Sequence, residues 1–124
     1  MSYSFENAGP LTLRASVAIA QYLRIHVDTN GQWAITGATA KASHVAATGV
    51  AAGAQLAGIP LIPGTVVPMI ASEALTLGEK VYGAAAGKLD DVTTNCLEGT
   101  LLSAAAADGA VVPVLIMPVS AVSL

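Results

Sequence analysis

The fold class is decided by the stretch LTLRASVAIAQYLRIHVD, residues 11–28. Apolar side chains occupy most of its odd positions, while polar side chains such as Arg14, Arg24 and His26 occupy even ones. A period of two puts alternate side chains on opposite faces of an extended chain. Because the stretch is longer than a usual strand, it predicts two strands bent near residues 20–21. We expect their polar face, Arg24 included, to point outward.

Glycine turns separate further strands along the chain. Asn30-Gly31 is typical of a tight hairpin turn with positive φ, and Asp108-Gly109 is a second such signal. The proline residues restrict the strands that contain them to sheet edges, strand starts or bulges. Strands are expected at residues 32–36, 45–50, 55–62, 65–71, 80–82, 88–92, 100–104 and 110–117. The pattern predicts a mainly β domain, small, compact and barrel-like or tulip-like, built from short strands and hairpins with little helix.

The two halves of the chain align at a shift of 56 residues, the distance from Arg24 to Lys80. The same shift places Gly31 over Gly87, and residues 50–54 over 106–110. Coinciding turn glycines and apolar alternation indicate a degenerate duplication. We therefore predict one β domain at residues 11–124 with pseudo-repeats at about 12–62 and 68–118, preceded by an N-terminal arm at residues 1–10.

Composition excludes several function classes. Of 124 residues, 5 are Lys or Arg and 8 are Asp or Glu, a charged share of 10%, where an average soluble domain has roughly 25%. Five scattered basic residues do not suit binding to nucleic acid. The uncharged run between Lys41 and Glu73 is interrupted by glycine and proline, so we expect no membrane span. A lone Cys96 and the lack of a signal-peptide pattern favour synthesis in a reducing cytoplasm.

No motif for catalysis, metal or cofactor binding stands out. His26, His44 and Cys96 are the only histidines and the only thiol, and none lies in a known ligand or nucleophile spacing. The oxygen-rich patch Asp90, Asp91, Asn95 and Glu98 lacks the alternating pattern of a calcium loop, so we interpret it as a solvated loop. We expect no enzyme activity, no metal and no cofactor.

A charge-poor exterior is typical of proteins that bury surface against partners, because interface centres are depleted in charge. The aromatic residues are the natural candidates for anchors in such an interface. They are Tyr3, Phe5, Trp33 and Tyr82. For Trp33 the alternative is a place in the core beside Ile35.

Three segments together resemble the capsid cement, or head decoration, proteins of tailed bacteriophages. The segments are RASVAIAQYLRIHVDTNGQW (14–33), LTLGEKVYGAAAGKL (75–89) and GTLLSAAAADGAVVPVLI (99–116). The resemblance implies a small β-rich protein without an active site that binds the outer surface of the assembled major capsid protein and stabilises the head against the pressure of packaged DNA. It also implies self-association as a homotrimer, with a dimer as the other option, and a place on the virion after synthesis in the bacterial cytoplasm.

Two other readings stay open at this stage. A β-sandwich binding module for carbohydrate or a cell surface, displayed on a virion or a cell, would need an exposed aromatic platform. A small enzyme would need a pocket that brings together His26, His44 and Cys96. On the first reading, the arm at residues 1–10, with Tyr3 and Phe5, orders against the capsid or a neighbouring subunit.

Overall fold

The computed structural model describes residues 10–117, which form ten short strands and a single 3₁₀ turn. The prediction of a mainly β fold with little helix is confirmed. The elements, in chain order, are β1 (Leu11–Arg14), β2 (Arg24–Val27), β3 (Trp33–Ile35), β4 (His44–Ala46), β5 (Gln55–Pro60), β6 (Val66–Ile70), β7 (Lys80–Gly83), η1 (Ala85–Gly87), β8 (Leu89–Asp90), β9 (Leu97–Leu101) and β10 (Val111–Ile116).

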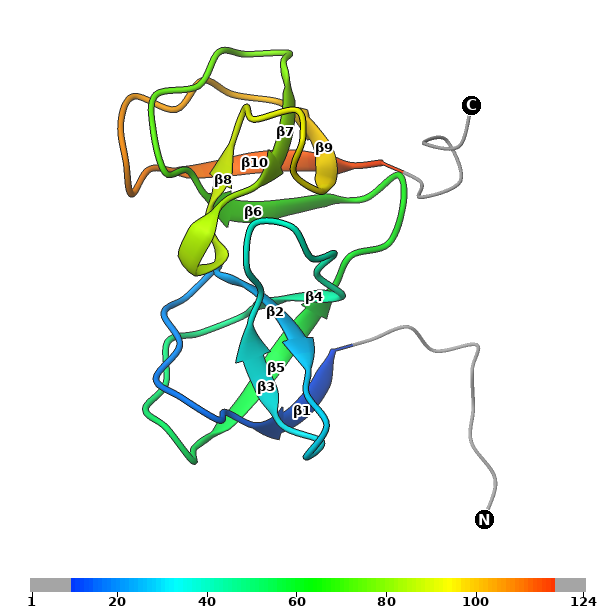
Figure 1. Cartoon of the computed structure of the whole chain (residues 1–124), viewed down its shortest axis with the longest axis vertical. Coiled ribbons are helices and arrows are strands. Elements are labelled where there is room, and N and C mark those ends of the chain that lie inside the picture. Colours follow the sequence, from blue (N-terminus) through cyan, green and yellow to red (C-terminus); the bar gives the residue numbers. More distant parts are fainter. Residues whose placement is uncertain (1–9, 118–124) are drawn as a thin grey trace.

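The strands form two five-stranded antiparallel sheets with the same connectivity. The first sheet has the order β1-β5-β4-β2-β3 and the second the order β6-β10-β9-β7-β8. In Figure 1 the first sheet makes the lower half of the molecule and the second sheet the upper half. The two open sheets pack in the manner of a β-sandwich, and no closed barrel forms within residues 10–117.

Positions 56 residues apart do the same job in the two sheets. A parallel bridge joins Ala15 to Trp33 in the first, and its counterpart joins Ala71 to Leu89 in the second. The outer strand pairs match as well, since β1 pairs with β5 and β6 pairs with β10. Three turn positions have positive φ in both sheets: Tyr22 and Gly78, Gly31 and Gly87, Gly53 and Gly109. The offset found in the sequence is therefore also the offset between equivalent backbone positions.

The turn after β2 differs from the tight primed turn expected at Asn30-Gly31. Of these two residues only Gly31 has a positive φ, at 73°. The Asp28 carboxylate instead accepts hydrogen bonds from the backbone N–H groups of Asn30 (2.9 Å) and Gln32 (3.0 Å). An Asx-type turn that starts from the aspartate replaces the two-residue hairpin turn, because its side chain satisfies the local donors.

The long alternating stretch also folds differently from the expectation. β1 ends at Arg14, and residues 15–23 form a bent connection held by single bridges at Ala15 and Ile19. Arg24 does not lie on an outward polar face, because its side chain is fully buried. The alternation along β2 is real, but the face that carries Arg24 is covered by the second sheet.

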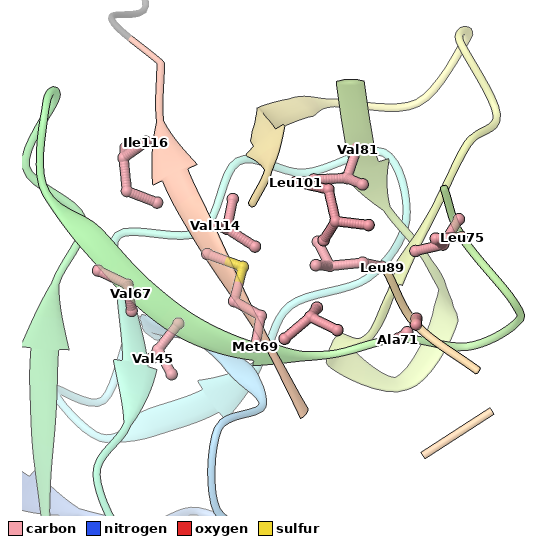
Figure 2. Packing of buried hydrophobic residues seen from close by; sticks show 12 residues of the cluster. Val45, Val67, Met69, Ala71, Leu75, Val81, Leu89, Leu101, Val114 and Ile116 are labelled. Atoms are coloured by element: carbon pink, nitrogen blue, oxygen red, sulfur yellow. The ribbon is translucent and has the colours of Figure 1, made fainter. Parts of the chain in front are cut away.

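Two clusters of buried apolar residues make up the core. One lies in the first sheet around Trp33, Ile25 and Leu56. The other fills the second sheet and also takes in Val45 from β4 of the first. Figure 2 shows Val45 below β6, next to Val67 and Met69. The second core is thus completed by a side chain from the first sheet, which fixes the two sheets relative to each other.

Candidate functional site

The chemically most unusual feature of the described residues is a buried ion pair between the two sheets. Arg24 of β2 donates from Nη1 to Glu98 Oε2 of β9 at 2.8 Å, and neither side chain is exposed to solvent. The other carboxylate oxygen of Glu98 accepts from Lys41 Nζ, also at 2.8 Å. One carboxylate therefore joins two cations of the first half of the chain to the second half.

Backbone carbonyls occupy the other donors of the Arg24 guanidinium. Nη2 donates to the carbonyl oxygens of Gly37 (2.9 Å) and Ala84 (3.1 Å), and Nε donates to that of Lys88 (3.1 Å). The space is tight, since a Cβ at Gly83 would lie 2.7 Å from Nη2. Both carboxylate oxygens and all three guanidinium nitrogens have protein partners, so this cluster works as a clamp between the sheets and offers no free group to a ligand.

The two histidines have separate local partners. His26 Nδ1 lies 3.0 Å from Thr36 Oγ1. The ring of His44 lies against that of Trp33, with 4.8 Å between centroids, and its Nδ1 lies 2.8 Å from Ser43 Oγ. Burial lowers the pKa of His44 below its ordinary value of 6.5.

Cys96 is half-buried just before β9, and its backbone N–H donates to Ala38 O. Its hydrogen bond continues the contact between the two halves of the chain close to the ion pair. Among the described residues no hydrogen bond links the thiol to either histidine.

The oxygen-rich patch at residues 90–98 does not converge on one point. Glu98 turns inward to the ion pair, while Asn95 donates from Nδ2 to the Gly83 carbonyl at 2.9 Å. Asp90 caps the loop by accepting from Val92 N–H at 3.1 Å. Within residues 10–117 there is no group of three or more His, Cys, Asp or Glu side chains that could hold a metal ion.

A carboxyl pair lies at the edge of this loop. The side-chain hydrogen bond between Glu73 and Asp91 raises the pKa of Glu73, and desolvation and the charge of Asp91 act in the same direction. The pair is exposed to solvent and is a local feature of the surface.

The proposed aromatic anchors fall in three different places. Trp33 is fully buried, and its indole N–H donates to Leu56 O at 2.8 Å, so Trp33 belongs to the core and presents no surface to a partner. This corrects its place among the interface candidates. Tyr82 is half-buried in β7. Tyr3 and Phe5 lie outside the described residues.

The sequence reading missed an apolar face on the outside of the second sheet. The ladder pairs Leu115 with Val66 and Pro113 with Pro68, and these four side chains point away from the second core. Six apolar residues on β6, β10 and the end of β9 form this outer face: Val66, Pro68, Leu102, Val111, Pro113 and Leu115. The signal was present in the unbroken apolar run of residues 111–117, where both phases of the alternation are apolar.

The corresponding face of the first sheet is more polar. Thr12 pairs there with Ala57, and Arg14 pairs with Gln55. Val111 at position 55 + 56 thus takes the place that Gln55 has in the first sheet. Two equivalent surfaces of one chain differ in chemistry, which points to different surroundings in the working protein.

No helix among the described residues has the length and apolar character needed to cross a membrane. No protein-family model matches the chain, and no curated protein sequence matches it. Among solved structures it is similar to the N base of the head fiber protein gp8.5 of bacteriophage phi29. The TM-score is 0.70 at 18% sequence identity, with 86% of this chain and 92% of that chain covered. The likeness extends over nearly the whole of both chains, and at this identity it shows that the two share a fold.

Proposed function

We propose that the chain is a structural protein of a phage head, a capsid cement protein that binds the outer surface of the assembled major capsid protein. The observation that carries the proposal is the fold shared with a phage head fiber base over 86% of the chain. The resemblance of three sequence segments to head decoration proteins supports the same function independently.

The surface chemistry supports a role in assembly. Large apolar side chains are exposed at several strand ends, and only 13 of the 124 residues carry charge (5 + 8). Extended apolar patches on a soluble protein mark interaction sites. The clamp around Arg24 also suits a protein under mechanical load, because it ties the two sheets together with charge-assisted hydrogen bonds.

The physical action we propose is linkage between binding and lattice stability. A protein that binds the assembled lattice and not the separated subunits stabilises the lattice by mass action. Many copies on one shell add their contributions, and contact with several capsid subunits at once raises the effective affinity. The proposed partners are the major capsid protein and further copies of this chain, as a trimer or a dimer, on the outside of the virion.

Cosedimentation tests the proposal. Shells are assembled from the major capsid protein encoded in the same phage genome, emptied of DNA, and mixed with this protein. We expect it to pellet with the shells, to saturate, and to raise the temperature at which the shells dissociate. Unassembled capsid subunits serve as the control. A protein that stays in the supernatant at all shell concentrations would contradict the proposal.

Two variants refine this experiment. Deletion of residues 2–9 tests the proposed arm, and undiminished pelleting would show that the arm is not needed. The triple replacement of His26, His44 and Cys96 tests the expectation that there is no catalysis, and we expect unchanged binding to shells. The carbohydrate-binding alternative is weakened by the burial of Trp33, and hits on a glycan array would revive it.

A further inference from the structure

The two sheets contact each other in a head-to-tail manner. The outer face of the first sheet, at Val45 of β4 and Ile59 of β5, packs against the core of the second sheet. The residue covered there is Val67 on the inner face of β6, which retains only 2% of its exposure. Figure 2 shows Val45 and Val67 side by side at this junction. The first sheet therefore uses its outer face, and the second sheet uses its inner face.

Each sheet has one face of this kind left over. Val45 pairs with Arg24 and Thr100 pairs with Lys80, so Thr100 is the second-sheet equivalent of Val45, and Leu115 is that of Ile59. Ile59 packs against a core cluster, whereas Leu115 belongs to neither cluster of the described residues. This leaves the outer face of the second sheet without its counterpart.

The complementary vacancy lies on the first sheet. Leu11 is the equivalent of Val67, 56 residues earlier, and pairs with Gly58 as Val67 pairs with Val114. Leu11 is 42% exposed, although its equivalent is almost completely buried. The chain thus ends, in the sense of its repeat, with an unused apolar outer face at Leu115 and an uncovered apolar inner edge at Leu11.

We propose that a second copy of this chain continues the repeat, with the Leu115 face of one copy covering the Leu11 edge of the next. The contact is continuous with the junction already present inside each molecule, which is the reason for choosing a second copy as the occupant. In repeat proteins each unit buries its apolar face only against its neighbour. A head-to-tail contact of this type closes into a ring when the rotation allows it.

The contact between copies is weaker than the one inside the chain. Inside the chain, Arg24 and Glu98 form the buried ion pair. Their equivalents are Lys80, at an offset of 56, and Ser43, whose carbonyl accepts from Leu61 as that of Glu98 accepts from Met117. Lysine and serine make no ion pair, so association depends on apolar burial alone. We expect it to be concentration-dependent in solution and reinforced where many copies sit on one shell.

Sedimentation velocity of the full chain, without capsid, tests the proposal. We expect wild type to associate as concentration rises, and Leu11→Lys and Leu115→Lys each to weaken association by at least about tenfold, the effect of roughly 1.4 kcal/mol. Val66→Lys blocks the same outer face at a residue that is 53% exposed and pairs with Leu115, so it serves if Leu115→Lys unfolds. The control is Leu77→Lys, a substitution at the most exposed large apolar residue (62%), with wild-type behaviour expected.

Mixing the variants separates head-to-tail contact from other arrangements. A copy with Leu11→Lys keeps an intact outer face, and a copy with Leu115→Lys or Val66→Lys keeps an intact Leu11 edge. We expect an equimolar mixture to form heterodimers that grow no further. Monomeric wild type at all concentrations, or a mixture that stays monomeric, overturns the proposal.

Loss of shell binding with unchanged self-association in Leu115→Lys would assign the outer face to the capsid instead. That result would also overturn the proposal. Because no shell is present in the sedimentation experiment, its failure is distinct from a failure of the cement function.

Discussion

Arg24 is the residue on which the relation between the sheets depends. A buried ion pair adds little net stability, because desolvation offsets the attraction, yet removal of one partner leaves a buried charge unpaired. Here Glu98 neutralises Arg24, and backbone carbonyls from both halves of the chain satisfy the other donors. The cluster therefore acts on which arrangement of the sheets is allowed more than on how stable the chain is overall.

Replacement of Glu98 tests this view. Glu98→Gln leaves Arg24 without its counter-ion in a site closed to solvent, and we expect the free energy of unfolding in urea to fall by about 3 kcal/mol. Lys41→Met is the matched control, since Lys41 contacts the same carboxylate but its side chain is 33% exposed. Its loss should cost no more than about 1 kcal/mol. Equal losses for the two variants would contradict the account.

His44 gives the fold a dependence on pH. Burial against Trp33 lowers the pKa of His44 below 6.5, its value in the unfolded chain. In the range between these two values the unfolded state binds more protons, so the free energy of unfolding falls as pH is lowered from 7 through 6.5. His44→Gln should remove this part of the slope. Denaturant titrations between pH 5 and pH 8 measure it, and an identical slope in the variant would exclude His44 as its source.

Among the elements, the turns repeat most faithfully. Gly53 and Gly109 hold φ values of 83° and 91° at equivalent turns, and a Cβ on either would meet no atom within 4 Å. We expect Gly53→Ala and Gly109→Ala each to lower the free energy of unfolding by about 1 kcal/mol through backbone strain alone. Gly37→Ala is the control, as it has equal space and no positive φ. Thermal unfolding that ranks Gly37→Ala with the other two would refute the strain argument.

Strand β10 breaks a rule that guided the sequence reading. Proline is expected at sheet edges, and Pro68 does lie in the edge strand β6, but its ladder partner Pro113 lies in a strand with neighbours on both sides. Leu102 donates to the Pro113 carbonyl just beyond the end of β9, so the N–H that proline lacks falls where the partner strand has ended. The shortness of β9 makes the proline tolerable.

Local patterns predicted the strands well where one face is buried and the other is not. Residues 33–35, 55–60, 66–70 and 111–116 all fall inside expected strands, because alternation and turn residues agree there. The burial of Arg24 could not be predicted from the sequence, because it depends on Glu98 arriving from 74 residues away. The apolar outer face of the second sheet was equally hidden, since a run that is apolar in both phases does not say which side faces solvent.

For the whole molecule, the shared core and the ion pair predict a single cooperative transition. Trp33 is the only tryptophan and lies in the first core, so its fluorescence reports on the first sheet, while far-ultraviolet circular dichroism reports on both. We expect the two urea curves to coincide for wild type. They should separate in Glu98→Gln, with the second sheet unfolding at lower urea. Separate curves in wild type would show that the two sheets are independent.

The pairing of each sheet's first strand with its last strand has a consequence for synthesis on the ribosome. β1 finds its partner only when β5 has emerged, so the first sheet can close once about residue 60 is free, before most of the second sheet exists. Contacts between distant segments form slowly. During this interval Arg24 is still waiting for Glu98, and Val45 has no core to enter. The nascent first half is therefore a folded platform with one unfinished side, and the second half completes it by folding onto that side.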